Sequence, residues 1–72
     1  DVRAIRRRLN LTQKAFAKLF GFSAAAVRDW EQRRRRPEAS ARVLLKIIDR
    51  DPESVVRALA SSGGDGVNLD KD

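Results

Sequence analysis

The chain has 72 residues and a formal net charge of +6, from 16 basic and 10 acidic side chains. It contains no Cys and no His, so it lacks a disulfide framework, the commonest metal ligand and the commonest general base. We therefore expect one small all-α domain that is not an enzyme and holds no metal and no cofactor. Its apolar runs are far shorter than the ~20 residues of a membrane span. Because the chain begins at Asp1 rather than Met, we also expect that residues preceding it were removed.

The charge is distributed unevenly along the chain. Residues 1–36 carry a net +8, residues 37–60 are neutral, and residues 61–72 carry −2. A basic half joined to a neutral half favours one surface for a polyanion, with nucleic acid as the leading candidate, and another surface for a different contact. A basic surface that is merely solvated is the alternative.

Helical patterns fill residues 2–60. Apolar residues at Val2, Ile5 and Leu9 predict a first amphipathic helix, which we expect to end at Asn10. Thr12 is a suitable N-cap for a second helix, and Gly21 supplies the left-handed residue that ends it.

Ser23 repeats the N-cap pattern for a third helix, expected from Ala24 to about Gln32. Val27 and Trp30 are three residues apart and share its inner face. Trp30 is therefore expected in the core rather than as a stacking platform for single-stranded nucleic acid. The four arginines at residues 33–36 predict a loop.

Pro37 suits the first turn of a fourth helix, with Glu38 near its positive end. Asp51 and Pro52 suit the cap and first position of a fifth helix. We expect a compact five-helix bundle at residues 1–60, with a helix-turn-helix at about 12–32 and dimerisation helices at about 38–60. Residues 61–72, with three glycines, predict a flexible tail.

The segment LTQKAFAKLFGFSAAAVRDWE, residues 11–31, is typical of a helix-turn-helix: cap, helix, Gly turn, cap, helix. It resembles the Cro/repressor-type (XRE) helix-turn-helix domain. This resemblance implies a lambda-repressor-like fold. The continuation RDWEQRRRRPEASARVLLKII is similar to the HigA-like antitoxin branch of putative transcriptional regulators. Arg33 stands where that pattern usually has Gly. If Arg33 is left-handed, we expect a cost of about 1 kcal/mol.

The resemblance implies how the segment meets double-stranded DNA. The start of the third helix would face base edges in the major groove, with Arg28 suited to bidentate bonding of guanine. The expected base-reading residues are Ser23, Ala24, Ala25, Arg28 and Asp29. The expected phosphate contacts are Gln13, Lys14, Arg33, Arg34, Arg35 and Arg36, with Arg6, Arg7 and Arg8 as an extension.

Each of these roles has a structural alternative. Gln13 would be a solvated surface residue, and the alanines would be plain helix formers. Arg28 would pair with Glu31 or with its neighbour Asp29. Asp29 would only balance charge at the edge of the helix, rather than accept from cytosine N4 or orient a neighbouring arginine.

The last two helices carry more apolar residues than one core-facing stripe needs. The family implied by the resemblance commonly dimerises through its last helices, so we expect a two-fold homodimer that reads a palindrome. Packing within one chain is the alternative. The expected dimer residues are Val43, Ile47, Val55, Val56 and Leu59.

The sequence leads to two hypotheses of function. The first is a sequence-specific DNA-binding transcriptional regulator, a bacterial repressor or antitoxin that autoregulates its operon and is cytoplasmic and nucleoid-associated. The second is a protein-interaction module, a toxin-neutralising antitoxin fragment with DNA binding secondary. RNA binding has less support, because the sequence shows neither RNA-recognition strands nor stacking aromatics.

Overall fold

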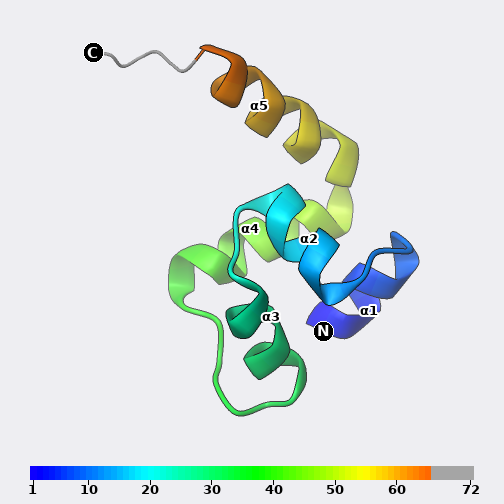
Figure 1. Ribbon diagram of the computed structural model, residues 1–72, viewed down its shortest axis with the longest axis vertical. Helices are drawn as coiled ribbons and strands as arrows, with labels where there is room; N and C mark the ends of the chain where they lie inside the picture. The colour runs from blue at the N-terminus through cyan, green and yellow to red at the C-terminus, as the bar shows by residue number, and fades with distance from the viewer. Residues whose placement is uncertain (66–72) are drawn as a thin grey trace.

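The computed structural model describes the backbone of residues 1–65 and the side chains of residues 1–60 (Figure 1). All regular structure in this part of the chain is helical, which confirms the expected all-α five-helix fold. The helices are α1 (Val2–Arg8), α2 (Gln13–Phe20), α3 (Ala24–Glu31), α4 (Ala39–Arg50) and α5 (Pro52–Asp65).

The starts of α2, α3 and α5 are held by side-chain caps, as the sequence predicts. In each case the capping oxygen accepts a hydrogen bond from the backbone N–H three residues later, which satisfies a donor that the helix leaves free. The bonds run from Ala15 to Thr12 Oγ1 at 3.0 Å, from Ala26 to Ser23 Oγ at 3.0 Å, and from Ser54 to Asp51 Oδ1 at 3.1 Å.

Each of the first three helices is followed, within two residues of its last, by a residue with left-handed backbone: Asn10 (φ 58°), Gly21 (φ 80°) and Arg33 (φ 62°). This conformation turns the chain sharply and lets later N–H groups reach the last helical carbonyls. After α3, the N–H of Arg34 donates to Asp29 O at 2.9 Å. The expected loop at residues 33–36 therefore begins with a left-handed arginine in a position that usually holds glycine.

The start of α4 differs from the prediction. Pro37 precedes the helix instead of occupying its first turn, and α4 begins at Ala39. Glu38 is the N-cap, with extended backbone (φ −64°, ψ 166°) and no side-chain capping bond. The reason is that the loop stays extended through Glu38, whose carbonyl accepts the first helical bond from Arg42 N–H at 2.9 Å.

The core joins all five helices. α2 packs against α3, α4 against α5, and α1 contacts both α3 and α4. Phe16, Phe20, Val27 and Ile48 are almost completely buried. The whole core comprises Val2, Ile5, Phe16, Ala17, Phe20, Val27, Trp30, Leu45, Ile48 and Val55.

α5 leaves the bundle at one end (Figure 1). Its first turns pack on α2 and α4, and its later turns extend beyond the other helices. α5 ends at Asp65, so its last five residues fall within the predicted tail of residues 61–72. The rest of that predicted tail, residues 66–72, lies outside the described residues.

Candidate nucleic-acid interface

Aromatic packing fixes the angle between α2 and α3. The ring of Phe16 in α2 stacks on that of Phe22 in the connecting turn at 6.1 Å, and Phe22 meets Trp30 of α3 edge-on at 5.0 Å. Aromatic pairs in this geometry stabilise a contact beyond their burial. Trp30 is 8% exposed, which confirms its expected place in the core. The inner face of α3 is therefore held rigidly by the core, while its outer face is free to make other contacts.

The start of α3 lies at the surface. Ser23, Ala24, Ala25 and Arg28 are all exposed, and Arg28 makes no ion pair within the described residues. The alternative pairing of Arg28 with Glu31 is wrong, because Glu31 points inward. With only methyl groups at residues 24 and 25, a ligand can approach the backbone of this turn closely.

Glu31 is an enclosed acidic residue that receives hydrogen bonds from α1 and α2. Its side chain is fully enclosed, and the Arg6 guanidinium bonds it through Nε at 2.6 Å and Nη2 at 2.9 Å. Gln13 Nε2 donates to it at 3.1 Å, and Arg3 Nε lies 3.5 Å away. A third Arg6 nitrogen donates to the carbonyl of Leu11 at 2.9 Å. One carboxylate thus ties α1, α2 and α3 together.

These contacts hold the pKa of the Glu31 carboxyl below its usual value. The hydrogen bonds from Arg6 are the main cause, with smaller contributions from Gln13 and Arg3, and burial opposes them. The same pair raises the pKa of the Arg6 guanidinium. Glu31 is therefore ionised wherever the domain is folded near neutral pH.

Two expected phosphate contacts are placed differently from the prediction. Gln13 is half-buried and its amide N–H is engaged by Glu31, because the enclosed carboxylate needs donors. Arg6, expected to extend the DNA contact, is likewise committed to Glu31. The sequence holds a signal for this: Glu31 lies four residues after buried Val27 and so shares the inner face of α3.

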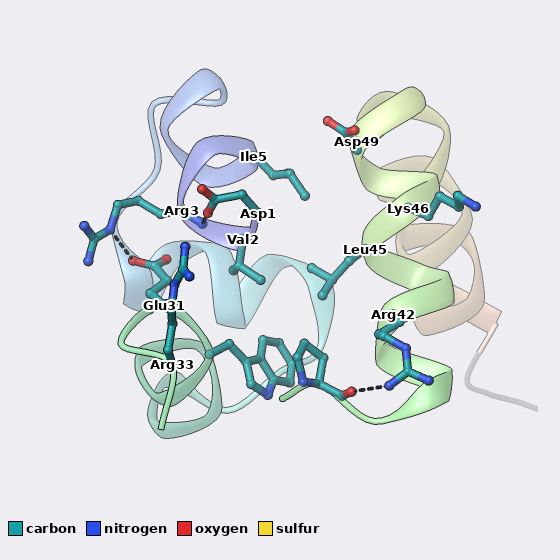
Figure 2. Close-up of a pocket in the computed structure, with 12 residues that line it drawn as sticks. Asp1, Val2, Arg3, Ile5, Glu31, Arg33, Arg42, Leu45, Lys46 and Asp49 are labelled. Carbon is teal, nitrogen blue, oxygen red and sulfur yellow. Dashed lines mark hydrogen bonds and ion pairs between the residues drawn. The ribbon is translucent and has the colours of Figure 1, made fainter. Parts of the chain in front are cut away.

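The remaining basic residues stay at the surface. Lys14 at the start of α2 is exposed, as are all four arginines at residues 33–36. Asp29 is half-buried, and its carboxylate lies 4.0 Å from Arg35 Nε, in line with its expected role of orienting an arginine. Arg33 differs from the others, because it lines a cleft beside α1 (Figure 2).

The expected dimer residues separate into two groups. Val43, Ile47 and Leu59 are 60%, 47% and 40% exposed, and Val56 is half-buried. Val55 is only 6% exposed and belongs to the core, so its expected place at the interface is wrong. The reason is that α5 turns Val55 inward against the bundle.

Two further features of the described residues bear on the class of protein. None of their helices has the length and apolar character needed to cross a membrane. Among the same residues, no group of three or more acidic side chains is placed to hold a metal ion.

The fold is an all-α bundle in which α2, the turn at Gly21 and α3 are arranged as in a helix-turn-helix domain. Residues 1–57 match the family model of the MqsA antitoxin, the antitoxin component of a bacterial toxin–antitoxin system, and the chain belongs to this family. It is 34% identical over 55 residues to antitoxin HigA-2 of Vibrio cholerae serotype O1, covering 76% of this chain. The chain spans about half, 53%, of the length of that curated relative. No solved structure matches. Membership of an antitoxin family indicates a regulatory protein.

Proposed function

We propose that the protein is a sequence-specific double-stranded DNA-binding regulator, a repressor that controls its own toxin–antitoxin operon. One observation carries the proposal: the start of α3 is exposed while its other face is locked by the core and by Glu31. Such a helix can enter a major groove at a fixed angle. Arg28 would read a base edge, and Arg34, Arg35 and Arg36 would hold flanking phosphates. The protein would then work in the cytoplasm, at the nucleoid.

A salt titration tests DNA binding. The protein is titrated with duplex DNA from upstream of its own gene and with a scrambled duplex of the same composition. Affinity for both should fall as salt rises, because phosphate contacts release counterions. The upstream duplex should keep a specificity ratio of at least about 10³. Equal affinity for the two duplexes would contradict sequence-specific regulation.

Two arginine variants separate reading from positioning. Arg28→Ala should relax the preference at one base pair, with a loss of about 1–3 kcal/mol on the preferred duplex. Arg36→Ala should weaken binding to all duplexes alike and make the salt dependence shallower. Arg50→Ala removes the same charge from the far end of α4 and serves as the control. If Arg28→Ala and Arg36→Ala behave alike, the division of roles is wrong.

We further propose that the protein acts as a homodimer through α4 and α5. Val56 and Leu59 line an apolar groove with Leu19, about 630 Å³ in volume, between α2 and α5. Exposed apolar surface of this kind favours association. A two-fold dimer would place two recognition helices about 34 Å apart, on successive major grooves of a palindrome.

A toxin partner is the second proposed contact. The family is that of an antitoxin component, which supports the neutralisation of a toxin by the whole protein. The test is co-purification of the full-length protein with the product of the neighbouring open reading frame. If no complex forms with the full-length protein, the toxin contact is wrong while DNA regulation can still stand.

A further inference from the structure

A cleft of about 560 Å³ lies between α1 and α4 (Figure 2). Val2 and Ile5 point into it from α1, and Leu45 points toward them from α4. Trp30 and Pro37 also line it. From α3 the cleft is lined by Trp30 and Glu31 only, and none of the expected base-reading residues lines it.

The acidic groups of the cleft are already engaged. The Asp1 carboxylate accepts from the N–H of Arg3 at 3.0 Å, as the N-cap of α1. Glu31 is enclosed by its own donors, and Asp49 pairs with Arg8. The arginine partners of Glu31 and Asp49 balance the charge of these two carboxylates.

Three cations of the cleft have no acidic partner among the described residues. Arg33, Arg42 and Lys46 are all exposed and line the cleft, and none of them forms an ion pair there. Arg42 donates one N–H, from Nη1, to the carbonyl of Pro37 at 2.8 Å, and its other N–H groups remain available as donors. The cleft therefore combines an apolar wall with an excess of positive charge.

We propose that this cleft is a docking site for a segment of a partner protein that presents an apolar side chain flanked by carboxylates. The apolar side chain would cover the edges of Ile5 and Leu45 that stay accessible, 8% and 6% of the two residues, and the carboxylates would meet Arg42 and Lys46. Charge complementarity of this kind selects a partner and sets its orientation. A DNA backbone would satisfy the cations but would leave the apolar wall unfilled, so a protein segment fits both features.

The docking site goes beyond DNA reading, since it uses other residues. It is also independent of the toxin contact, because the segment is defined by its chemistry and not by its source. If a toxin co-purifies by binding another surface, that result neither supports nor contradicts the docking site, which has its own test.

Trp30 provides the readout, because it lines the cleft and is the single tryptophan of the chain. The full chain is titrated with a short capped peptide of leucine and glutamate while Trp30 emission is followed. Two matched peptides replace glutamate by lysine or leucine by serine. The leucine–glutamate peptide should change the emission saturably, and both matched peptides should bind at least about fivefold more weakly.

Charge reversal then locates the contact. Lys46→Glu and Arg42→Glu should each weaken the leucine–glutamate peptide about fivefold or more, since they replace attraction by repulsion. Arg50→Glu makes the same change of charge on α4, outside the cleft, and should leave affinity within about twofold. Thermal unfolding by circular dichroism confirms that each variant is folded.

Three results would overturn the proposal. They are no saturable response to the leucine–glutamate peptide, equal losses for Lys46→Glu and Arg50→Glu, or equal binding of the serine-containing peptide. A further contrary result would be that duplex DNA changes Trp30 emission and Lys46→Glu weakens DNA binding as much as Arg36→Ala. The cleft would then belong to the DNA interface.

Discussion

At the scale of single residues, Glu31 connects α3 to both α1 and α2 through its carboxylate. Its carboxylate is fully enclosed and receives hydrogen bonds from Arg6 and Gln13. A buried ion pair adds little net stability over an apolar pair, but removing one partner leaves an uncompensated charge. Its main role is thus to fix where α3 lies relative to α1 and α2.

We expect Glu31→Gln to lower the free energy of unfolding by about 3 kcal/mol, because Arg6 loses its counter-charge in a mostly enclosed place. Urea unfolding followed by circular dichroism measures this. Glu38→Gln removes an exposed carboxylate of the same type and should change stability by less than about 0.5 kcal/mol. Similar losses for the two variants would contradict the assigned role of Glu31.

The lowered pKa of Glu31 also predicts a pH dependence. The unfolded state binds the proton more readily than the folded state, so the stability that Glu31 contributes is complete above its ordinary pKa of 4.5. It should decline as the pH falls from that value through the lower pKa of the folded state. Unfolding curves between neutral and acidic pH should show this decline in the native chain and a flatter profile in Glu31→Gln. Parallel profiles would be the contrary result.

Arg33 is the second residue with a predictable effect, because its left-handed backbone (φ 62°) disfavours any side chain with a Cβ. Arg33→Gly should raise the free energy of unfolding by up to about 1 kcal/mol, less the backbone entropy that glycine adds to the unfolded state. Arg36→Gly, which lacks that conformation, is the control and should not stabilise. A loss of stability in Arg33→Gly would mean that its side chain contributes more than the strain costs.

At the scale of elements, α3 is fixed at three places: its N-cap at Ser23, its left-handed C-terminal residue Arg33 and its inner acid Glu31. The turn before it depends on Gly21, which has φ 80°. A Cβ built on Gly21 would meet no atom within 4 Å, so only the backbone conformation demands glycine there.

This separation of causes gives a prediction for Gly21. Gly21→Ala should lower the free energy of unfolding by about 1–2 kcal/mol through backbone strain alone. Gly21→Asn should lose less, because asparagine tolerates the left-handed region better. Thermal or urea unfolding of both variants provides the comparison. An Asn variant less stable than the Ala variant would contradict the backbone explanation.

At the scale of the whole molecule, the basic helix-turn-helix and the neutral α4–α5 half divide the surface by charge. The proposed dimer uses the neutral half, where two copies approach without strong repulsion. Leu59→Asp should shift the native chain from dimer to monomer in sedimentation velocity, since it places a charge in the apolar groove. Ser54→Asp, also exposed on α5, should remain dimeric. If the native chain sediments as a monomer at high concentration, the dimer is wrong.

Most of the fold follows from local patterns. Thr12, Ser23 and Asp51 cap their helices as expected, because capping needs only one side chain and a backbone N–H three residues away. The start of α4 was harder to predict, since Glu38 is extended by the path of the preceding loop rather than by its own preference. The candidate site was predicted in part: Arg28 is exposed as expected, whereas Gln13 is engaged by Glu31.

Patterns along the chain are enough to predict five helices, the caps of α2, α3 and α5, and the basic charge of residues 1–36, because these depend on neighbours along the chain. Only the tertiary structure decided which charged residues remain available. Arg6 pairs with Glu31, which lies 25 residues away in the sequence, and therefore points away from the surface. Val55 is buried in the core, whereas Val43 is exposed. These outcomes depend on which helix faces which, and periodicity within a single helix does not contain that information. The positive charge is thus a property of the sequence, while the part of it that can meet a partner is a property of the fold.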